Sequence, residues 1–174
     1  MGGRSSHAAR LKRIRLFASD VDGVLTDAGM YYGESGDEWK KFSTRDGMGI
    51  KLMQQAGLIT ALVTQEQTKL VARRGEKLAI PEVHQGARNK VAVLRGLAEK
   101  YAITLEEMAY IGDDVNDLEA LQAVGLSAAP ADAHPTVLRV VHYRCRAKGG
   151  EGAVREIADA ILAAQGFSPA GVKA

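Results

Sequence analysis

Asp20 and Asp22 stand two residues apart, directly after the apolar run formed by residues 14–19. In extended backbone, positions two apart point to the same side, so the two carboxylates lie close together. Neighbouring negative charges in a partly desolvated site repel unless one carboxylate is protonated or a cation lies between them. The pair therefore indicates acid–base chemistry or cation binding, although an Asp-x-Asp-Gly sequence also forms ordinary turns.

A second acidic cluster favours the cation. Asp113, Asp114 and Asp117 follow another apolar run, residues 108–111. Mg²⁺ prefers oxygen ligands, is commonly held by one or two carboxylates, and keeps waters that a phosphate can displace. We predict Asp113 as the magnesium ligand of this cluster. Asp114 and Asp117 are also suited to begin a helix, and we favour that role for Asp114.

These residue types match the needs of phosphoryl transfer, which are a nucleophile, a cation and donors for the phosphate oxygens. Asp20 is the predicted nucleophile, and Asp22 the acid that protonates the departing alkoxide and later activates water. Thr64 can bind a phosphate oxygen. Lys90 can offset the negative charge of Asp20 and the phosphate, although alone it would be read as solvated surface. The sequence thus predicts a phosphatase with an aspartyl-phosphate intermediate.

The elements that position these residues alternate between short apolar runs and longer amphipathic segments. Buried strands are predicted over residues 14–19, 58–63, 108–111 and 126–129. Helices are predicted over residues 67–78, 90–101, 114–124 and 153–164, with Thr104 and Glu107 spaced as a capping box. The alternation indicates an α/β fold, a three-layer, Rossmann-like, mostly parallel sheet whose strand ends bring the acidic clusters and Thr64 to one edge.

One segment breaks this alternation. Residues 30–32 and 38–42 contain aromatic and charged side chains and flank the turn-rich residues 33–37. This pattern predicts a projecting β-hairpin in place of a cap domain. Its aromatic side chains either pack on the parent domain or form a contact with another subunit.

Composition restricts the class of protein further. A chain of 174 residues with 46% hydrophobic residues fits one domain, here residues 13–165, between a flexible leader (1–12) and a flexible tail (166–174). The net charge of +2 is spread along the chain, so we expect small-molecule partners or further copies, without nucleic acid or membrane. The single cysteine, Cys145, excludes an internal disulfide and favours a cytoplasmic location.

Taken together, the motifs resemble the four motifs of the haloacid dehalogenase superfamily in order and spacing. They are residues 20–27, Thr64, Lys90 and residues 112–117. Within the superfamily, residues 13–164 are similar to the 3-deoxy-manno-octulosonate (KDO) 8-phosphate phosphatases and the nonulosonate (KDN or N-acylneuraminate) 9-phosphate phosphatases. The segments that carry this closer resemblance are residues 41–47 and 148–156.

The resemblance implies roles for individual residues. Asp20 is the nucleophile, Asp22 the acid and base, and Thr64 and Lys90 bind phosphate, while Mg²⁺ is held by Asp20, Asp113 and the Asp22 carbonyl. It also implies a homotetramer whose active sites are closed by neighbouring subunits. The spacing between the motifs agrees, because it leaves room for a hairpin but not for a separate lid domain.

Substrate choice depends on the residues after Thr64. Gln65 departs from the glycine common in both groups, while Glu66, Arg74 and Lys77 look more like the nonulosonate enzymes, in which such residues meet the sugar acid from an adjacent subunit. We predict that Lys77 or Arg74 pairs with the substrate carboxylate and that Glu66 accepts hydrogen bonds from sugar hydroxyls. A solvated helix face is the alternative.

The motifs supply three further assignments. Arg45 and Asn116 complete the predicted substrate-binding set, and Asp117 is predicted to support the site. Arg155 and the glycines of residues 149–152 stay unassigned, because they either resemble a segment that folds over a neighbouring active site or connect a strand to the last helix.

Two other classes compete with the phosphatase. A signalling receiver also places acids, a threonine and a lysine at a sheet edge, but it lacks the late Gly-Asp-Asp-x-x-Asp cluster. A non-catalytic assembly domain, related to the phosphatase-like module of CMP-acylneuraminate synthetases, would be free to lose Asp20, Asp22 or Lys90. Their joint presence favours an enzyme, a magnesium-dependent phosphatase acting on a phosphorylated 2-keto-3-deoxy sugar acid.

Overall fold

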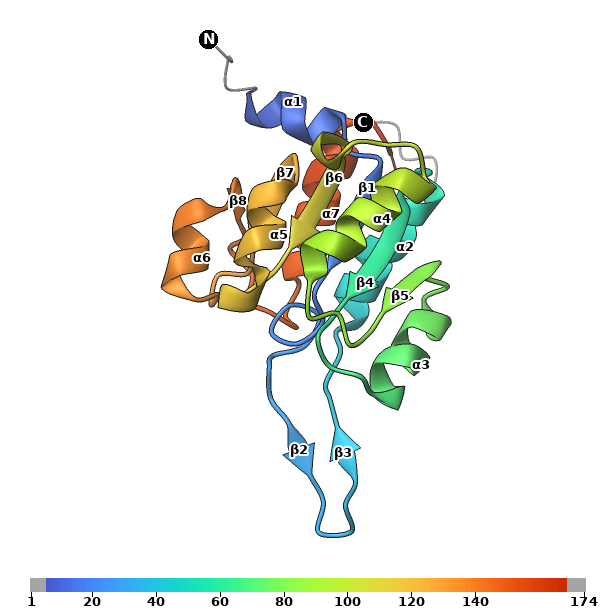
Figure 1. Ribbon diagram of the computed structural model, residues 1–174, viewed down its shortest axis with the longest axis vertical. Helices are drawn as coiled ribbons and strands as arrows, with labels where there is room; N and C mark the ends of the chain where they lie inside the picture. Colours follow the sequence, from blue (N-terminus) through green and yellow to red (C-terminus); the bar gives the residue numbers. More distant parts are fainter. Residues whose placement is uncertain (1–5, 169–174) are drawn as a thin grey trace.

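The computed structural model describes residues 6–168, which form a six-stranded sheet covered by helices on both faces (Figure 1). The strands are β1 (Leu16–Ser19), β4 (Ile59–Val63), β5 (Glu82–His84), β6 (Met108–Ile111), β7 (Leu126–Ala129) and β8 (Tyr143–Arg144). The helices are α1 (His7–Lys12), α2 (Thr44–Gln55), α3 (Lys69–Lys77), α4 (Lys90–Lys100), α5 (Leu118–Ala123), α6 (Pro135–Val140) and α7 (Ala153–Ala164). Two short 3₁₀ turns are η1 (Leu105–Glu107) and η2 (Val115–Asp117).

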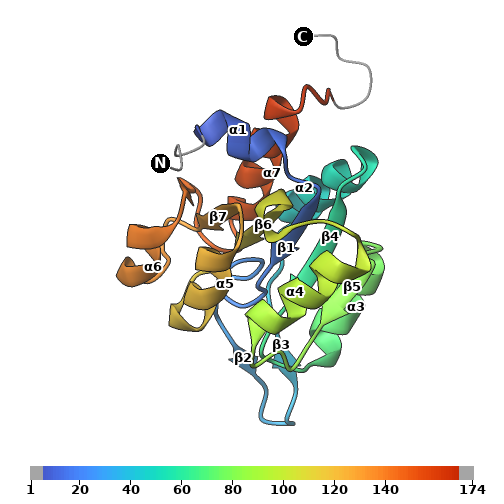
Figure 2. The ribbon, with the colours of Figure 1, turned by 45° about the horizontal axis from the view of Figure 1, so that its top comes forward.

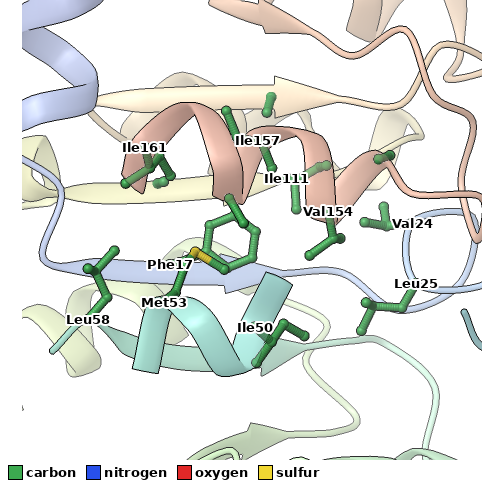
Figure 3. Close-up of a cluster of buried hydrophobic side chains, with 14 of the residues drawn as sticks. Phe17, Val24, Leu25, Ile50, Met53, Leu58, Ile111, Val154, Ile157 and Ile161 are labelled. Atoms are coloured by element: carbon green, nitrogen blue, oxygen red, sulfur yellow. The ribbon is translucent and has the colours of Figure 1, made fainter. Parts of the chain in front are cut away.

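Every strand of this sheet is parallel to its neighbours, in the order β5-β4-β1-β6-β7-β8. Alternate residues of the central strand β1 enter two separate apolar clusters. Phe17 packs with residues of α2 and α7 on one face (Figure 3), and Leu16 packs with residues of α4 and α5 on the other. Figure 2 shows α4 and α5 in front of the sheet and α7 behind it. The predicted three-layer α/β fold is confirmed.

The strand order places the site. From β1 the chain moves to β4 and β5 on one side, and later to β6, β7 and β8 on the other. Ligands of such sheets bind beyond the carboxyl ends of the strands, where the strand order changes direction. Asp20 follows β1, Thr64 follows β4 and Gly112 follows β6, so the predicted residues converge at this switch point.

Most predicted elements are present, with shifted ends. Helices α3 and α4 begin after the N-caps Thr68 and Asn89, and Thr104 with Glu107 forms the predicted capping box. Residues 114–124 are not one helix but η2 followed by α5. The sequence interpretation did not include α2, β5, α6 and β8.

The predicted hairpin is confirmed as β2 (Tyr31–Tyr32) paired with β3 (Glu38–Trp39), which projects beyond the sheet (Figure 1). Its aromatic side chains do not pack on the parent domain. Tyr31, Tyr32 and Trp39 are 53%, 75% and 66% exposed. Phe42, after the hairpin, does pack against the core. The packing alternative is therefore wrong for the hairpin itself.

The flexible leader predicted for residues 1–12 needs correction. Residues 7–12 form α1, whose Leu11 is buried in the cluster that also holds α7 residues, and Arg10 donates a hydrogen bond to the carbonyl of Gly125. The predicted tail, residues 166–174, begins with Gly166 and Phe167, and Phe167 also packs against the core. Residues 1–5 and 169–174 lie outside the described part of the chain.

Asp46 connects the second helix to the last one. The N-cap position of α7 is Gly152, which has no side chain to accept the first free N–H groups of the helix. Asp46, buried on α2, does so instead: its carboxylate accepts from the backbone N–H of Gly152 at 3.2 Å and of Arg155 at 3.0 Å. A carboxylate at a helix N-terminus also interacts favourably with the helix dipole.

We expect Asp46→Ala to lower the free energy of unfolding by about 2 kcal/mol, because it leaves buried backbone donors unpaired. Urea unfolding followed by circular dichroism measures this. Asp159→Ala is the matched control, since Asp159 is exposed on α7 and contacts the half-buried Arg155 side chain at 2.9 Å. Its loss should stay below about 0.5 kcal/mol. Equal losses in the two variants would contradict the capping role of Asp46.

Candidate active site

Lys90 lies at the centre of the site. It is the first residue of α4, and its ammonium contacts Asp20 Oδ2 at 3.0 Å and Asp117 Oδ1 at 2.6 Å. All three side chains are buried. Burial alone would lower the pKa of Lys90, but the charges of Asp20 and Asp117 outweigh it and raise this pKa. Lys90 therefore carries a positive charge beside Asp20, as the sequence predicted, and is not solvated surface.

Asp117 has hydrogen-bond partners at both of its carboxylate oxygens. Its Oδ1 also accepts a hydrogen bond from the Tyr110 hydroxyl at 2.6 Å. Its Oδ2 accepts from the backbone N–H of Asp113 at 3.0 Å and of Asp114 at 3.3 Å. With both oxygens occupied, Asp117 orders the loop after β6 and fixes Lys90, which is the supporting position expected of it.

Asp20 and Asp113 are the carboxylates that can hold a cation. One oxygen from each, with one from Asp117, lies within 4.8 Å of the others. Burial, followed by the charge of Asp117, raises the pKa of Asp20 to about 7 against the opposing effect of Lys90. Burial and the charges of Asp117 and Asp114 likewise raise the pKa of Asp113 to about 7. Such an all-oxygen, negatively charged group fits a hard divalent cation such as Mg²⁺.

Gly23 lets the loop after β1 approach this group. Its φ of +79° lies in the left-handed region, and a Cβ built there would meet Asp113 Oδ2 at 2.0 Å. A larger residue would displace either the loop that carries Asp22 or the carboxylate of Asp113. The glycine of the Asp-x-Asp-Gly sequence thus allows the two acidic clusters to touch.

Asp22 and Glu66 are joined by a lysine that the sequence reading did not single out. Lys40, the residue after β3, contacts Asp22 Oδ1 at 2.7 Å and Glu66 Oε2 at 2.6 Å. The Lys40 side chain is 0% exposed. Among residues 6–168, Asp22 Oδ2 is shielded and has no hydrogen-bond partner.

A cavity of about 460 Å³ opens over these groups. It is lined by Asp20, Asp22, Ala28, Thr64, Gln65, Glu66, Asp113, Asp114 and Asn116. Thr64 is almost fully buried in its floor, and Asn116 reaches across it to Gln65 at 3.5 Å. Asp114 caps η2, as favoured from the sequence. The cavity therefore unites the predicted nucleophile, acid, metal ligand and phosphate-binding threonine.

Three predicted substrate-binding residues lie outside this cavity. Arg74 donates to the Ser43 carbonyl at 2.8 Å and stacks over the Phe42 ring, so it holds the segment after the hairpin. Lys77 is exposed in the last turn of α3, and Arg45 is exposed in the first turn of α2.

The glycine-rich segment packs on its own chain. Gly150 donates to the carbonyl of Val24 at 2.9 Å, and a Cβ built on Gly149 would meet the carbonyl oxygen of Gly23 at 1.9 Å. Arg155 pairs with Asp159 on the same helix. Gly149 and Gly150, in the segment that leads into α7, thus pack against the loop that follows β1.

Lys40 and Tyr110 are the contacts that sequence reasoning missed. Tyr110 reads as a buried strand residue, and its position two residues before Gly112 gives no sign of a hydroxyl bond to Asp117. Lys40 stands beside Lys41 in a charged stretch of the hairpin. Nothing in the sequence separates the buried Lys40 from the exposed Lys41, because the acidic partners of Lys40 lie in distant segments.

The amino-acid sequence is similar to those of known phosphatases. The profile of the haloacid dehalogenase-like hydrolase family matches residues 59–157. The 3-deoxy-D-manno-octulosonate 8-phosphate phosphatase of Escherichia coli K12 is 44% identical over 91% of this chain and 84% of its own length. That of Yersinia pestis is 43% identical over 90% of this chain and 83% of its own.

Solved structures give the same result. The octulosonate 8-phosphate phosphatase of Moraxella catarrhalis, in complex with magnesium ion, phosphate ion and KDO, has a TM-score of 0.89 at 38% identity and covers 91% of each chain. The Yersinia pestis enzyme also has a TM-score of 0.89, at 42% identity, over 91% of this chain and 86% of its own.

Asp113→Asn tests the cation site through stability. The carboxyl has a higher pKa folded than unfolded, so it binds more protons in the folded state between about pH 4 and 7. Its contribution to stability is therefore lost as the pH rises through this window. Without metal, the variant should be more stable than the wild type at pH 8, by on the order of 1 kcal/mol, and similar at pH 5.

Magnesium should stabilise the wild type more than the variant, because an ion that binds only the folded state raises the stability of that state. We expect Mg²⁺ to raise the thermal midpoint of the wild type at pH 8 and to have little effect on Asp113→Asn. Differential scanning fluorimetry with EDTA or MgCl₂ measures both effects. Asp114→Asn, the control at the exposed neighbour, should keep the magnesium response. The same response in Asp113→Asn would remove Asp113 from the cation site.

Proposed function

The chain belongs to the haloacid dehalogenase-like hydrolases and is a magnesium-dependent phosphatase, and we propose that it hydrolyses 3-deoxy-D-manno-octulosonate 8-phosphate through a phosphorylated Asp20. The observation that carries the proposal is the convergence of Asp20, Asp22, Thr64 and Asp113 in one cavity. The relatives support this substrate, because proteins named as phosphatases of this compound are 43–44% identical in sequence to this chain. With these residues joined in one site, the non-catalytic assembly domain is set aside.

The first half-reaction uses Asp20 and Asp22. An Asp20 carboxylate oxygen attacks phosphorus, the bond from phosphorus to the ester oxygen breaks, and the carboxyl of Asp22 gives its proton to the departing sugar oxygen. The backbone N–H of Val21, at 2.8 Å from Asp20 Oδ1, and the ammonium of Lys90 hold the nucleophile in place. Thr64 and Lys90 offer donors to the phosphate oxygens.

The second half-reaction releases phosphate. Asp22, now a carboxylate, takes a proton from a water molecule as that water attacks phosphorus. The bond between phosphorus and the Asp20 oxygen breaks, which regenerates the Asp20 carboxylate and protonated Asp22. Asp20, Asp113 and the Asp22 carbonyl would hold Mg²⁺, which supplies positive charge to the phosphate oxygens and offsets the acids around it.

Recognition of the sugar acid is proposed to involve a neighbouring subunit. Arg45, Arg74 and Lys77 lie outside the cavity of their own chain, and the cavity is open to solvent. A homotetramer, joined in part through the exposed aromatics of the hairpin, would bring basic side chains of one copy to the substrate of the next. Glu66 and Asn116 line the cavity and contact the sugar from the same chain.

A nonulosonate 9-phosphate is the second candidate substrate. Glu66, Arg74 and Lys77 resemble residues of the enzymes that act on the nine-carbon acids. Both substrates share a keto-deoxy acid end and a primary phosphate ester, so the chemistry is the same. They differ in chain length and hence in the distance between carboxylate and phosphate.

Phosphate release from the octulosonate 8-phosphate and from KDN and N-acylneuraminate 9-phosphates, with and without MgCl₂, tests the substrate. We expect the eight-carbon ester to have the highest kcat/KM. Asp20→Asn should lower kcat at least about 10³-fold, because it removes the nucleophile. Asp159→Asn, on the surface of α7, should match the wild type.

Trapping the intermediate tests the mechanism independently. Acid quench of the wild type with ³²P-labelled substrate should leave label on the peptide that contains Asp20, and Asp20→Asn should retain none. Label on another residue would contradict the assignment of the nucleophile. A higher kcat/KM for a nine-carbon ester would replace the proposed substrate while leaving the chemistry intact.

Lys77→Ala tests recognition across subunits. If Lys77 pairs with the substrate carboxylate, KM for the sugar acid esters should rise about tenfold or more, since a charge-assisted contact is lost. KM for β-glycerophosphate, which has no carboxylate, should not change. An equal loss on both kinds of substrate would remove the recognition role.

A further inference from the structure

Lys40 connects three separate segments at the mouth of the active site. It follows β3 at the base of the hairpin, Asp22 lies in the loop after β1, and Glu66 lies in the loop after β4. Its ammonium lies 2.7 Å from Asp22 Oδ1 and 2.6 Å from Glu66 Oε2. The contact therefore ties the hairpin to both loops at the switch point of the sheet.

The burial of Lys40 sets it apart from an ordinary surface ion pair. Its side chain is 0% exposed, although the Glu66 side chain is 50% exposed. Lysine ammonium groups are almost never fully buried unless they are paired, because their hydration is lost. Fixing the long side chain also costs conformational entropy. The position is thus occupied by a lysine with two partners rather than by one that samples solvent.

The two carboxylate oxygens of Asp22 have different surroundings. Oδ1 accepts from Lys40, whereas Oδ2 is shielded and has no hydrogen-bond partner within residues 6–168. Asp22 also lines the cavity. A carboxyl group held by one oxygen cannot rotate freely, so its other oxygen keeps one direction.

We propose that Lys40 is a positioning residue that fixes the orientation of the Asp22 carboxyl in the cavity wall, so that this carboxyl can pass its proton to the leaving oxygen of the substrate. This inference rests on the proposed acid and base role of Asp22. Glu66 holds the other side of the same ammonium and keeps it from turning toward the substrate. Lys40 acts through Asp22 and contacts no reacting atom.

A leaving-group comparison isolates this role. An alkoxide, such as the one released from a sugar phosphate, needs a proton as the ester bond breaks, whereas p-nitrophenolate carries its negative charge without one. Loss of correct proton donation should therefore slow the first turnover of an alkyl ester and spare that of an aryl ester. A general loss of folding or of metal binding would slow both.

The experiment compares Lys40→Met, Lys40→Arg and Lys41→Met with the wild type by rapid quench in MgCl₂. For the octulosonate 8-phosphate, Lys40→Met should lower the first-turnover rate by about 100-fold, with KM within about threefold. For p-nitrophenyl phosphate, the first-turnover rate should change by less than about threefold. Lys40→Arg should recover most of the rate, because a guanidinium can also donate to two carboxylates.

Lys41→Met is the matched control. Lys41 is the next residue, is 54% exposed and pairs with Asp27 at 2.9 Å, away from Asp22. It should behave as the wild type on both esters. If Lys40→Met unfolds, Lys40→Gln, which keeps a polar group at this position, repeats the comparison.

Two results would overturn the inference. An equal loss on both esters would make Lys40 a structural residue, and a raised KM with unchanged first-turnover rate would make it a substrate contact. Failure of the wild type on the octulosonate ester would instead refute the proposed substrate. The comparison then uses β-glycerophosphate as the alkyl ester, so the role of Lys40 is decided separately.

Discussion

The ammonium of Lys90 between Asp20 and Asp117 is the interaction on which the site depends. Removing one partner from such a buried pair leaves an uncompensated charge, at a cost of about 3–5 kcal/mol. Asp117 is itself fixed by Tyr110 and by the backbone after β6. Tyr110 of β6 and Asp117 therefore fix the position of Lys90. Lys90 in turn holds Asp20 at the end of the neighbouring strand β1.

This arrangement leaves more negative than positive charge around Asp20 and Asp113. Within the described chain, Lys90 is the cation that touches Asp20, while Asp113 is under the influence of the negative charges of Asp114 and Asp117. Burial, and then the charge of Asp117, raise the pKa values of both Asp20 and Asp113. A divalent ion offsets the excess negative charge, so the same charges that weaken the metal-free fold create the affinity for magnesium.

The sequence predicts which residues meet at the edge of the sheet, because strand ends follow a general rule. Once residues 14–19, 58–63 and 108–111 are taken as parallel strands, their following residues must meet at one edge. Gly49 shows why other parts escape prediction. Glycine disfavours helix, yet α2 needs it, since a Cβ there would lie 3.0 Å from the Cα of Arg155 on α7. The contacts of Lys40 also escape prediction, because its partners Asp22 and Glu66 lie in two other loops that are distant in sequence.

The last helix also determines when the fold can close. Phe17 of β1 packs against Ile157 and Ile161 of α7 (Figure 3), although nearly the whole chain separates them in sequence. During synthesis, one apolar face of the central strand stays partly uncovered until α7 has left the ribosome, and the carboxylate of Asp46 waits for the helix that it caps. A nascent chain of this protein therefore exposes apolar surface from the synthesis of β1 until that of α7.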